Sequence, residues 1–346
     1  MSDVDQVLLA APRGFCAGVE MAIKALAWMV RAFEPPVYCY HEIVHNQLVV
    51  QRFRDLGVVF VDDISEVPAG RPAMLSAHGS APEVVEAARQ AGGYVVDAVC
   101  PLVTKVHHEV KTRAAKGYQI VYVAHQGHEE AEGTIAEAPD AIHRVETLAE
   151  VDALPTFAPD TPVALLAQTT LSHRDWAGVA DATKDRFPEL WMPNRSDLCF
   201  ATTNRQAALG EISHRCDAVV VIGSANSSNT RALEKLAREA GCEHVYRING
   251  PEELPADLSG TVGVTAGASA PEEVVRAVID RLDPTHGVEE IRIRDEEEYF
   301  PPPRNLRELI GAIDAVATFC LGGSVPDRPP LNDRTVRASD VLASLS

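Results

Sequence analysis

The sequence has few of the features that bind nucleic acids or membranes. Its 31 lysine and arginine residues are outnumbered by 50 aspartate and glutamate residues, the formal net charge is −19, and only 5% of the residues are aromatic. No basic stretch is interleaved with aromatic residues, so the chain should repel phosphate backbones. No apolar run approaches the roughly 20 residues of a membrane span. We therefore expect neither a nucleic-acid nor a membrane partner.

Secretory features are also missing. The segment MSDVDQVLLAAP lacks the basic start and apolar run of a signal peptide, which predicts a cytoplasmic location. The seven cysteines are an odd number and lie far apart, which favours reduced thiols over a disulfide framework. Four of them, Cys39, Cys216, Cys242 and Cys320, have no polar loop around them. We expect these four to be ordinary buried or half-buried residues.

The other three cysteines occupy equivalent places, one in each third of the chain. Cys16, Cys100 and Cys199 each open a polar or glycine-containing turn that leads into a helical pattern, in RGFCAGVEMAIKAL, DAVCPLVTKVHHEV and SDLCFATTNRQAAL. A lone free cysteine is most often a small core residue, but three in equivalent positions are not typical of that role. Their thiols can converge only if three similar lobes surround a common centre. The spacing favours a three-cysteine iron–sulfur site, and zinc is the alternative.

Short apolar runs alternate with helical patterns along most of the chain. Runs such as QIVYVAH and AVVVIG are typical of strands in parallel sheets covered on both faces, so the fold class is α/β. We expect three similar lobes, at residues 13–100, 101–195 and 196–283, around one central cavity. The strand within residues 1–12 can join the first or the third lobe. Residues 284–346 should form a partly disordered C-terminal arm.

Polar loops repeat with the same order in each third. His45, His78 and His128 lie in the corresponding loops HEIVHN, SAHGSAP and GHEEAEGT. The other members of this donor-rich set are Ser227, Ser228, Asn229 and Ser269, in SANSSNT and AGASAP. Ligands of parallel sheets bind beyond the carboxyl ends of the strands, where these loops lie. Imidazole, hydroxyl and amide donors together suit phosphate oxygens.

Acidic and hydroxyl residues in these loops are less distinctive. Glu130 stands between Glu129 and Glu132, and an acid in a first helical turn is often only solvated, which is the interpretation we give Glu129. A threonine in a loop, such as Thr169 or Thr202, is often only a helix cap.

Nine motifs in order carry a family resemblance. They are PRGFCAGVE, HEIVHN, SAHGSAP, CPLVTKVHHEV, GHEEAEGT, QTTLS, CFATTNRQ, GSANSSNT and VTAGASAPE. Together, from about residue 7 to residue 282, they closely resemble the 4-hydroxy-3-methylbut-2-enyl diphosphate reductase family, whose reaction is the last step of the methylerythritol phosphate route to isoprenoid precursors.

The resemblance implies a fold, a cofactor and a reaction. The fold is a pseudo-threefold α/β trefoil around one [4Fe–4S] cluster held by Cys16, Cys100 and Cys199, with one iron open to the hydroxyl of an allylic diphosphate. The diphosphate is held by His45, His78, His128, Ser227, Ser228, Asn229 and Ser269, with Thr202 nearby. Glu130 and Thr169 relay protons. Two electrons, from a donor such as ferredoxin or flavodoxin, and two protons give isopentenyl and dimethylallyl diphosphates.

Two other functions remain open at this point. One is a non-catalytic iron–sulfur redox sensor, which needs the cysteines but not a donor-rich cavity. The other is a cluster-dependent hydro-lyase, which turns over without an electron donor.

Overall fold

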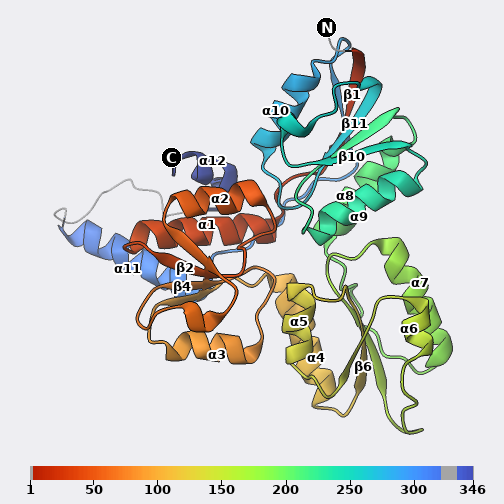
Figure 1. The fold of residues 1–346 in the computed structure, drawn as a ribbon. Coiled ribbons are helices and arrows are strands. Elements are labelled where there is room, and N and C mark those ends of the chain that lie inside the picture. Colours follow the sequence, from red (N-terminus) through yellow and green to blue (C-terminus); the bar gives the residue numbers. More distant parts are fainter. Residues whose placement is uncertain (1–2, 321–332, 346) are drawn as a thin grey trace.

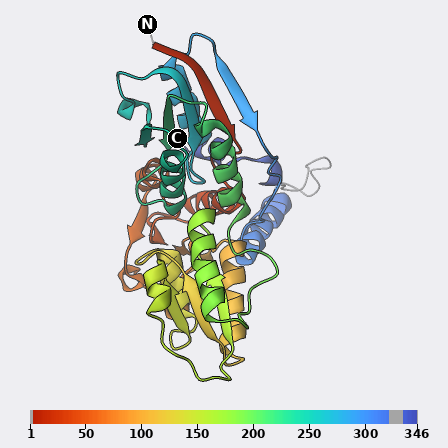
Figure 2. The same ribbon diagram turned by 90° about the vertical axis from the view of Figure 1, so that its right-hand side faces the viewer.

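The computed structural model describes residues 3–320 and 333–345. Three separate parallel sheets, each packed against helices, form three lobes (Figure 1). In both views the third lobe lies above the second (Figure 1, Figure 2), and in Figure 1 the first lobe lies to the left of both. The α/β class and the three-lobed arrangement predicted from the sequence are confirmed.

The first lobe contains a four-stranded sheet in the order β3-β2-β4-β5. Its elements are α1 (Ala17–Ala32), β2 (Val37–Tyr40), α2 (Gln47–Asp55), β3 (Val58–Val61), η1 (Ile64–Glu66), β4 (Ala73–Leu75), α3 (Pro82–Gln90) and β5 (Val95–Asp97). Helix α1 is rich in the strong helix formers Ala, Met and Leu. It ends before Pro35 and Pro36, because proline cannot continue a helix.

The second lobe contains a three-stranded sheet in the order β7-β6-β8. Its elements are α4 (Pro101–Ala114), β6 (Gln119–Val123), α5 (Glu129–Ala136), β7 (Ile142–Val145), α6 (Leu148–Asp152), β8 (Val163–Ala167) and α7 (His173–Arg186). Every residue of β8 is buried, as expected for a strand covered on both faces.

The third lobe takes in the N-terminal strand. Its five-stranded sheet has the order β10-β9-β11-β1-β12, and β1 pairs in parallel with both β11 and β12. In Figure 2 the red β1 and the light-blue β12 run side by side. The elements are β1 (Asp3–Ala11), α8 (Phe200–Ser213), β9 (Ala218–Ile222), α9 (Ser228–Glu239), β10 (His244–Ile248), η2 (Pro251–Glu253), β11 (Ser259–Ala266), α10 (Glu272–Leu282) and β12 (Val288–Arg292). We propose that the N-terminal strand β1 belongs to this lobe, because both of its neighbours in the sheet do.

The segment after residue 284 forms regular helices and a strand, where the sequence predicted a partly disordered arm. It supplies β12 to the third lobe and then α11 (Arg304–Cys320), η3 (Asp333–Thr335) and α12 (Ala338–Ala343). Leu306, Ala338 and Leu342 are buried in the hydrophobic core of the first lobe. The expected disorder falls in part on residues 321–332 and 346, which lie outside the described residues.

One prediction about the cysteines is wrong. All seven are free, and Cys39 and Cys242 are buried, but Cys320 is exposed. Helix α11 packs on the first lobe through its early residues, whereas Val316 and Phe319 near its end are exposed. Among the described residues, no hydrophobic core lies at the end of this helix in which Cys320 could be buried. Within residues 3–320 and 333–345 no helix is long and apolar enough to cross a bilayer.

Candidate active site

The three repeated cysteines line one cavity between the lobes, and each stands immediately before a helix. Cys16 precedes α1, Cys100 precedes α4 and Cys199 precedes α8. The backbone N–H groups of Ala201 and Thr202 bond to the sulfur of Cys199. Helix N-termini favour negative charge, so each thiol is placed where a thiolate is stabilised.

The thiol sulfurs lie close to one another around a small residue. A Cβ atom added to Gly18 would be 2.9 Å from Sγ of Cys100 and 3.9 Å from Sγ of Cys16. Burial raises the pKa of Cys199 to about 12, and the nearby Cys16 adds to the rise. Burial also raises the pKa of Cys100, again with a contribution from Cys16. A cationic partner would favour the thiolate forms of Cys100 and Cys199, which fits a metal group.

The separation of the sulfurs distinguishes a cluster from a single ion. Among the described residues one group of three or more metal-ligating side chains has all its ligand atoms within 4.8 Å, and it does not contain the cysteines. Two Zn–S bonds of about 2.3 Å limit the separation of two sulfurs on one zinc ion to about 4.6 Å. At least two of the three sulfurs therefore lie further apart than one zinc ion can bridge in this arrangement.

Three histidines form one wall of the same cavity. The rings of His45 and His78 are stacked, with centroids 3.9 Å apart and an angle of 13°. His128 stands almost perpendicular to both, at 5.5 and 6.1 Å. Burial and the two neighbouring histidines lower the pKa of His128 to about 3, and burial followed by His78 lowers the pKa of His45. A bound anion would oppose both shifts, since it favours the imidazolium form.

Buried polar atoms without partners lie at the start of α9. The hydroxyl of Ser228 and both polar atoms of the Asn229 side chain are buried and make no hydrogen bond. Ser227 has a partner, because its Oγ accepts from the N–H of Thr230 at 3.3 Å. Ser269 donates to the carbonyl oxygen of His45 at 2.9 Å. Buried polar groups are rarely left unpaired, so Ser228 and Asn229 indicate a polar ligand.

Glu130 is held beside His128 of the histidine wall. The N–H of Thr169 donates to Oε1 of Glu130 at 2.7 Å, and the Thr169 hydroxyl donates to Oε2 at 3.0 Å. The Glu130 N–H in turn donates to Nδ1 of His128 at 3.1 Å. Burial raises the pKa of Glu130 to about 7, although both bonds from Thr169 oppose the rise. This carboxyl group can therefore hold and release a proton near neutral pH.

Our interpretation of Glu129 as a solvated acid is wrong. Its Oε2 lies 2.9 Å from Nδ1 of His78, and its Oε1 lies 3.3 Å from Nδ1 of His41. Burial opposes ionisation of Glu129, but the bonds from His41 and His78 outweigh it and hold its pKa well below the ordinary value. Glu129 therefore orients His78. Sequence reasoning also missed His41, because it has no counterpart in the repeat.

A second carboxylate orients another histidine. Oε2 of Glu42 lies 3.6 Å from Nδ1 of His45 and accepts from Nδ2 of Asn226 at 2.8 Å. Glu42 belongs to the HEIVHN motif, and its position three residues before His45 in the sequence was the available signal.

The structure brings every predicted site residue to this one cavity. The residues that line it include Cys16, His45, His78, Cys100, His128, Glu130, Thr169, Cys199, Thr202, Ser227, Ser228, Asn229 and Ser269. They come from all three lobes, so the cavity exists only when the lobes are assembled.

Comparisons with known proteins agree on one family. The family described as LytB protein matches residues 7–283. The 4-hydroxy-3-methylbut-2-enyl diphosphate reductase of Rhodopirellula baltica is 48% identical over 307 residues, which are 87% of this chain and 96% of the relative. Reductase 1 of Mycobacterium tuberculosis is 48% identical over 283 residues, covering 80% and 85% of the two chains.

Solved structures give the same result. The E-1-hydroxy-2-methyl-but-2-enyl-4-diphosphate reductase from Plasmodium falciparum has a TM-score of 0.87 and 31% identity, and the match covers 90% of this chain and 99% of the other. A structure of (E)-4-hydroxy-3-methyl-but-2-enyl diphosphate reductase, the terminal enzyme of the non-mevalonate pathway, has a TM-score of 0.59 and 30% identity, covering 82% and 99%.

Proposed function

The chain belongs to the LytB protein family, and from this premise we propose that it catalyses the reductive dehydroxylation of (E)-4-hydroxy-3-methylbut-2-enyl diphosphate. The products are isopentenyl diphosphate and dimethylallyl diphosphate. The reductase name shared by relatives at 43% and 48% identity favours this reaction over a redox sensor or a hydro-lyase. One observation carries the assignment of the site: converging thiols and unpaired buried donors line the same cavity.

The family is one of iron–sulfur enzymes, and we assign the ligands as Cys16, Cys100 and Cys199, holding one [4Fe–4S] cluster. The fit is supported by three converging thiols at helix starts, by sulfurs too widely spaced for one zinc ion, and by the room that Gly18 leaves. When bound, such a cluster supplies electrons and an iron atom without a protein ligand, which can act as a Lewis acid.

The diphosphate group is assigned to the histidine wall and the start of α9. Charge-assisted bonds are about twice as strong as neutral ones, so a diphosphate gains most from donors that have no other partner. Ser228 and Asn229 are such donors, and the N-terminus of α9 adds backbone N–H groups. The remaining members of the set are His45, His78, His128, Thr202, Ser227 and Ser269.

Proton delivery is assigned to Glu130 with Thr169. The reaction consumes two electrons and two protons and releases the substrate hydroxyl as water. Hydroxide is a poor leaving group, so one proton must reach the departing oxygen. Glu130 lines the cavity with a buried carboxyl group, and the pKa of this group is about 7. Thr169 donates a hydrogen bond to each of its two oxygens. The electrons are proposed to come from a small carrier such as ferredoxin or flavodoxin. The cytoplasmic location stays a prediction.

The three candidate functions give different results in one assay. The protein is isolated without oxygen, its iron and sulfide are quantified, and the allylic diphosphate is supplied both with and without dithionite and a viologen mediator. The proposed function requires a cluster and formation of both isomeric diphosphates. A cluster without turnover would indicate the sensor, and turnover without reductant would indicate the hydro-lyase. Zinc without iron or sulfide would overturn the ligand assignment.

We expect Asn229→Ala to weaken substrate binding by roughly 10- to 100-fold. A hydrogen bond to a charged group contributes about 1.5–3 kcal/mol, and 1.4 kcal/mol is tenfold in affinity. Titration of the anaerobic protein with the diphosphate measures the change. In the ligand-free protein the same substitution should cost little stability, because the amide has no partner to lose.

Asn249→Ala is the matched control for this prediction. Asn249 lies in the same lobe, outside the residues that line the cavity, and its side-chain Nδ2 donates to Oε1 of Glu253 at 3.1 Å. Unchanged affinity in Asn229→Ala, or equal losses in the two variants, would place the diphosphate elsewhere.

A further inference from the structure

Arg205 is a fully buried charge beside the cysteines. It lies on α8, and its relative exposure is 0%. Arginine is almost never fully buried unless it is paired. Its partner is Glu296, whose two carboxylate oxygens each lie 3.1 Å from Nη1 of Arg205. Asn204 donates to the same carboxylate at 2.9 Å.

The other bonds of Arg205 reach two cysteine-bearing segments. Nη2 and Nε donate to the carbonyl oxygen of Gly14, at 2.7 and 3.2 Å, in the loop that leads into Cys16. Nη1 also donates to the carbonyl oxygen of Ala201 at 2.8 Å, in the first turn after Cys199. One guanidinium group therefore joins the approach to Cys16 with the start of the Cys199 helix.

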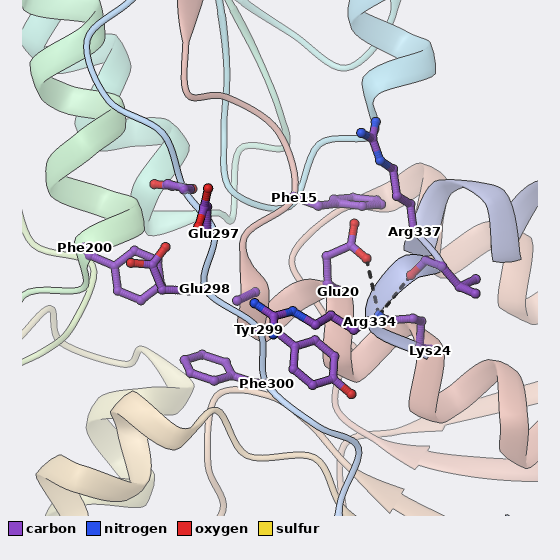
Figure 3. A pocket seen from close by; sticks show the side chains of 13 residues that line it. Phe15, Glu20, Lys24, Phe200, Glu297, Glu298, Tyr299, Phe300, Arg334 and Arg337 are labelled. Carbon is purple, nitrogen blue, oxygen red and sulfur yellow. Dashed lines mark hydrogen bonds and ion pairs between the residues drawn. The ribbon is translucent and has the colours of Figure 1, made fainter. Parts of the chain in front are cut away.

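The C-terminal segment holds α1 as well. The N–H of Ala338 donates to Oε2 of Glu20 at 2.7 Å, and Nζ of Lys24 donates to the carbonyl oxygens of Asp333 and Val336 at 3.0 and 3.1 Å. Glu20 and Lys24 of α1 line one cavity of about 280 Å³ together with Arg334 and Arg337 (Figure 3). Phe15 and Phe200, the neighbours of two cysteines, line this cavity too. The segment thus contacts both helices that begin after Cys16 and Cys199.

We propose that Arg205, fixed by Glu296, is a positioning residue that holds Cys16 and Cys199 at the separation the cluster needs and places a compensated positive charge beside them. The inference rests on the proposed function, because it requires these cysteines to be the ligands. Glu296 and residues 333–338 lie beyond residue 283, where the family match ends. The C-terminal segment thereby contributes to the cysteine cavity, although none of the segment's described residues lines it.

The charge of Arg205 should affect the reduction potential of the cluster in a direction that a less rigid structure alone would not produce. Nη1 of Arg205 donates to the carbonyl oxygen of Ala201, two residues after Cys199, so the guanidinium charge lies close to this ligand. Reduction adds an electron to the cluster, and its potential depends on the local charge. Glu296→Gln leaves the cation uncompensated and should raise the reduction potential. Arg205→Met leaves the carboxylate alone and should lower it.

The experiment compares these two variants with the parent protein and with Glu298→Gln. Glu298 is an exposed carboxylate two residues from Glu296 that lines the same cavity. Reduction potentials are measured by electron paramagnetic resonance titration, and cluster loss to a chelator is followed by absorbance. We expect shifts of opposite sign and cluster loss roughly 10- to 100-fold faster in both variants, the scale seen when partners of metal ligands are removed.

A measurement on the metal-free protein tests the same proposal when a variant cannot keep its cluster. Alkylation of Cys16 should be faster in Glu296→Gln than in Glu298→Gln, because the preceding loop is no longer held. Equal potentials, cluster lifetimes and alkylation rates in these two variants would overturn the inference alone. A parent protein that binds no iron and sulfide would overturn the proposed function and this inference with it.

Discussion

Replacing Cys16, Cys100 or Cys199 by serine should abolish the iron–sulfur cluster and, with it, all reductive turnover. A serine hydroxyl is a much poorer ligand for iron than a thiolate, and three protein ligands leave no redundancy. Iron and sulfide analysis of anaerobically prepared variants measures the loss. Cys242→Ser is the control, because Cys242 is buried in the core of the third lobe and should leave the cluster intact. A cluster that survives serine at any of the three positions would contradict the ligand assignment.

A glycine substitution tests the same site without touching a ligand. A Cβ atom at Gly18 would lie 2.9 Å from the Cys100 sulfur, closer than real Cβ contacts, so Gly18→Ala must displace that sulfur. We expect reduced cluster content in Gly18→Ala and normal content in Gly210→Ala. Gly210 is also helical, on α8, and no heavy atom lies within 4 Å of an added Cβ. Equal cluster content in the two variants would show that the sulfurs need not converge around Gly18.

The repeat in the sequence explains why so much of the site could be predicted. Parallel strands end in loops that face one edge of a sheet, so three equivalent loops in each of three lobes must point to one centre. The structure places His45, His78 and His128 on one wall of the cavity for this reason. The strand runs were equally visible, because strands such as β8 and β9 are buried on both faces and contain only apolar residues.

Contacts outside the repeat could not be predicted in this way. Glu129 looks like an ordinary acid at a helix start, and only the packing of the first lobe against the second brings His41 and His78 to it. Glu296 lies far from Arg205 in the sequence, in a stretch of several acids, so nothing local marks it as the partner of a buried arginine. Burial and pairing of these charges are set by tertiary structure, which hydrophobic periodicity does not report.

Glu130→Gln should lower the turnover of substrate by roughly 10²–10⁴-fold, the usual range for loss of a general acid. Glutamine keeps the shape of the side chain: its amide oxygen can accept from the Thr169 N–H and its NH2 group can donate to the Thr169 hydroxyl oxygen, but it cannot supply a proton. We therefore expect the cluster and substrate affinity to survive while the rate falls. Steady-state reduction with dithionite and a viologen mediator measures the rate. The control is Glu132→Gln, an exposed acid in the same helical turn, since Glu129 orients His78 and is unsuitable.

The pH dependence gives this assignment a second test. Burial raises the pKa of Glu130 to about 7, so the carboxyl group is protonated below that pH and loses its proton above it. A proton donor acts only while it is protonated, so kcat/KM of the parent should fall as the pH rises through about 7, and this fall should be missing in Glu130→Gln. Near-normal turnover in Glu130→Gln, or an unchanged alkaline fall in that variant, would move the proton source to another group. If both tests succeed, the desolvation that makes Glu130 costly to ionise is also what keeps its proton available for the departing hydroxyl.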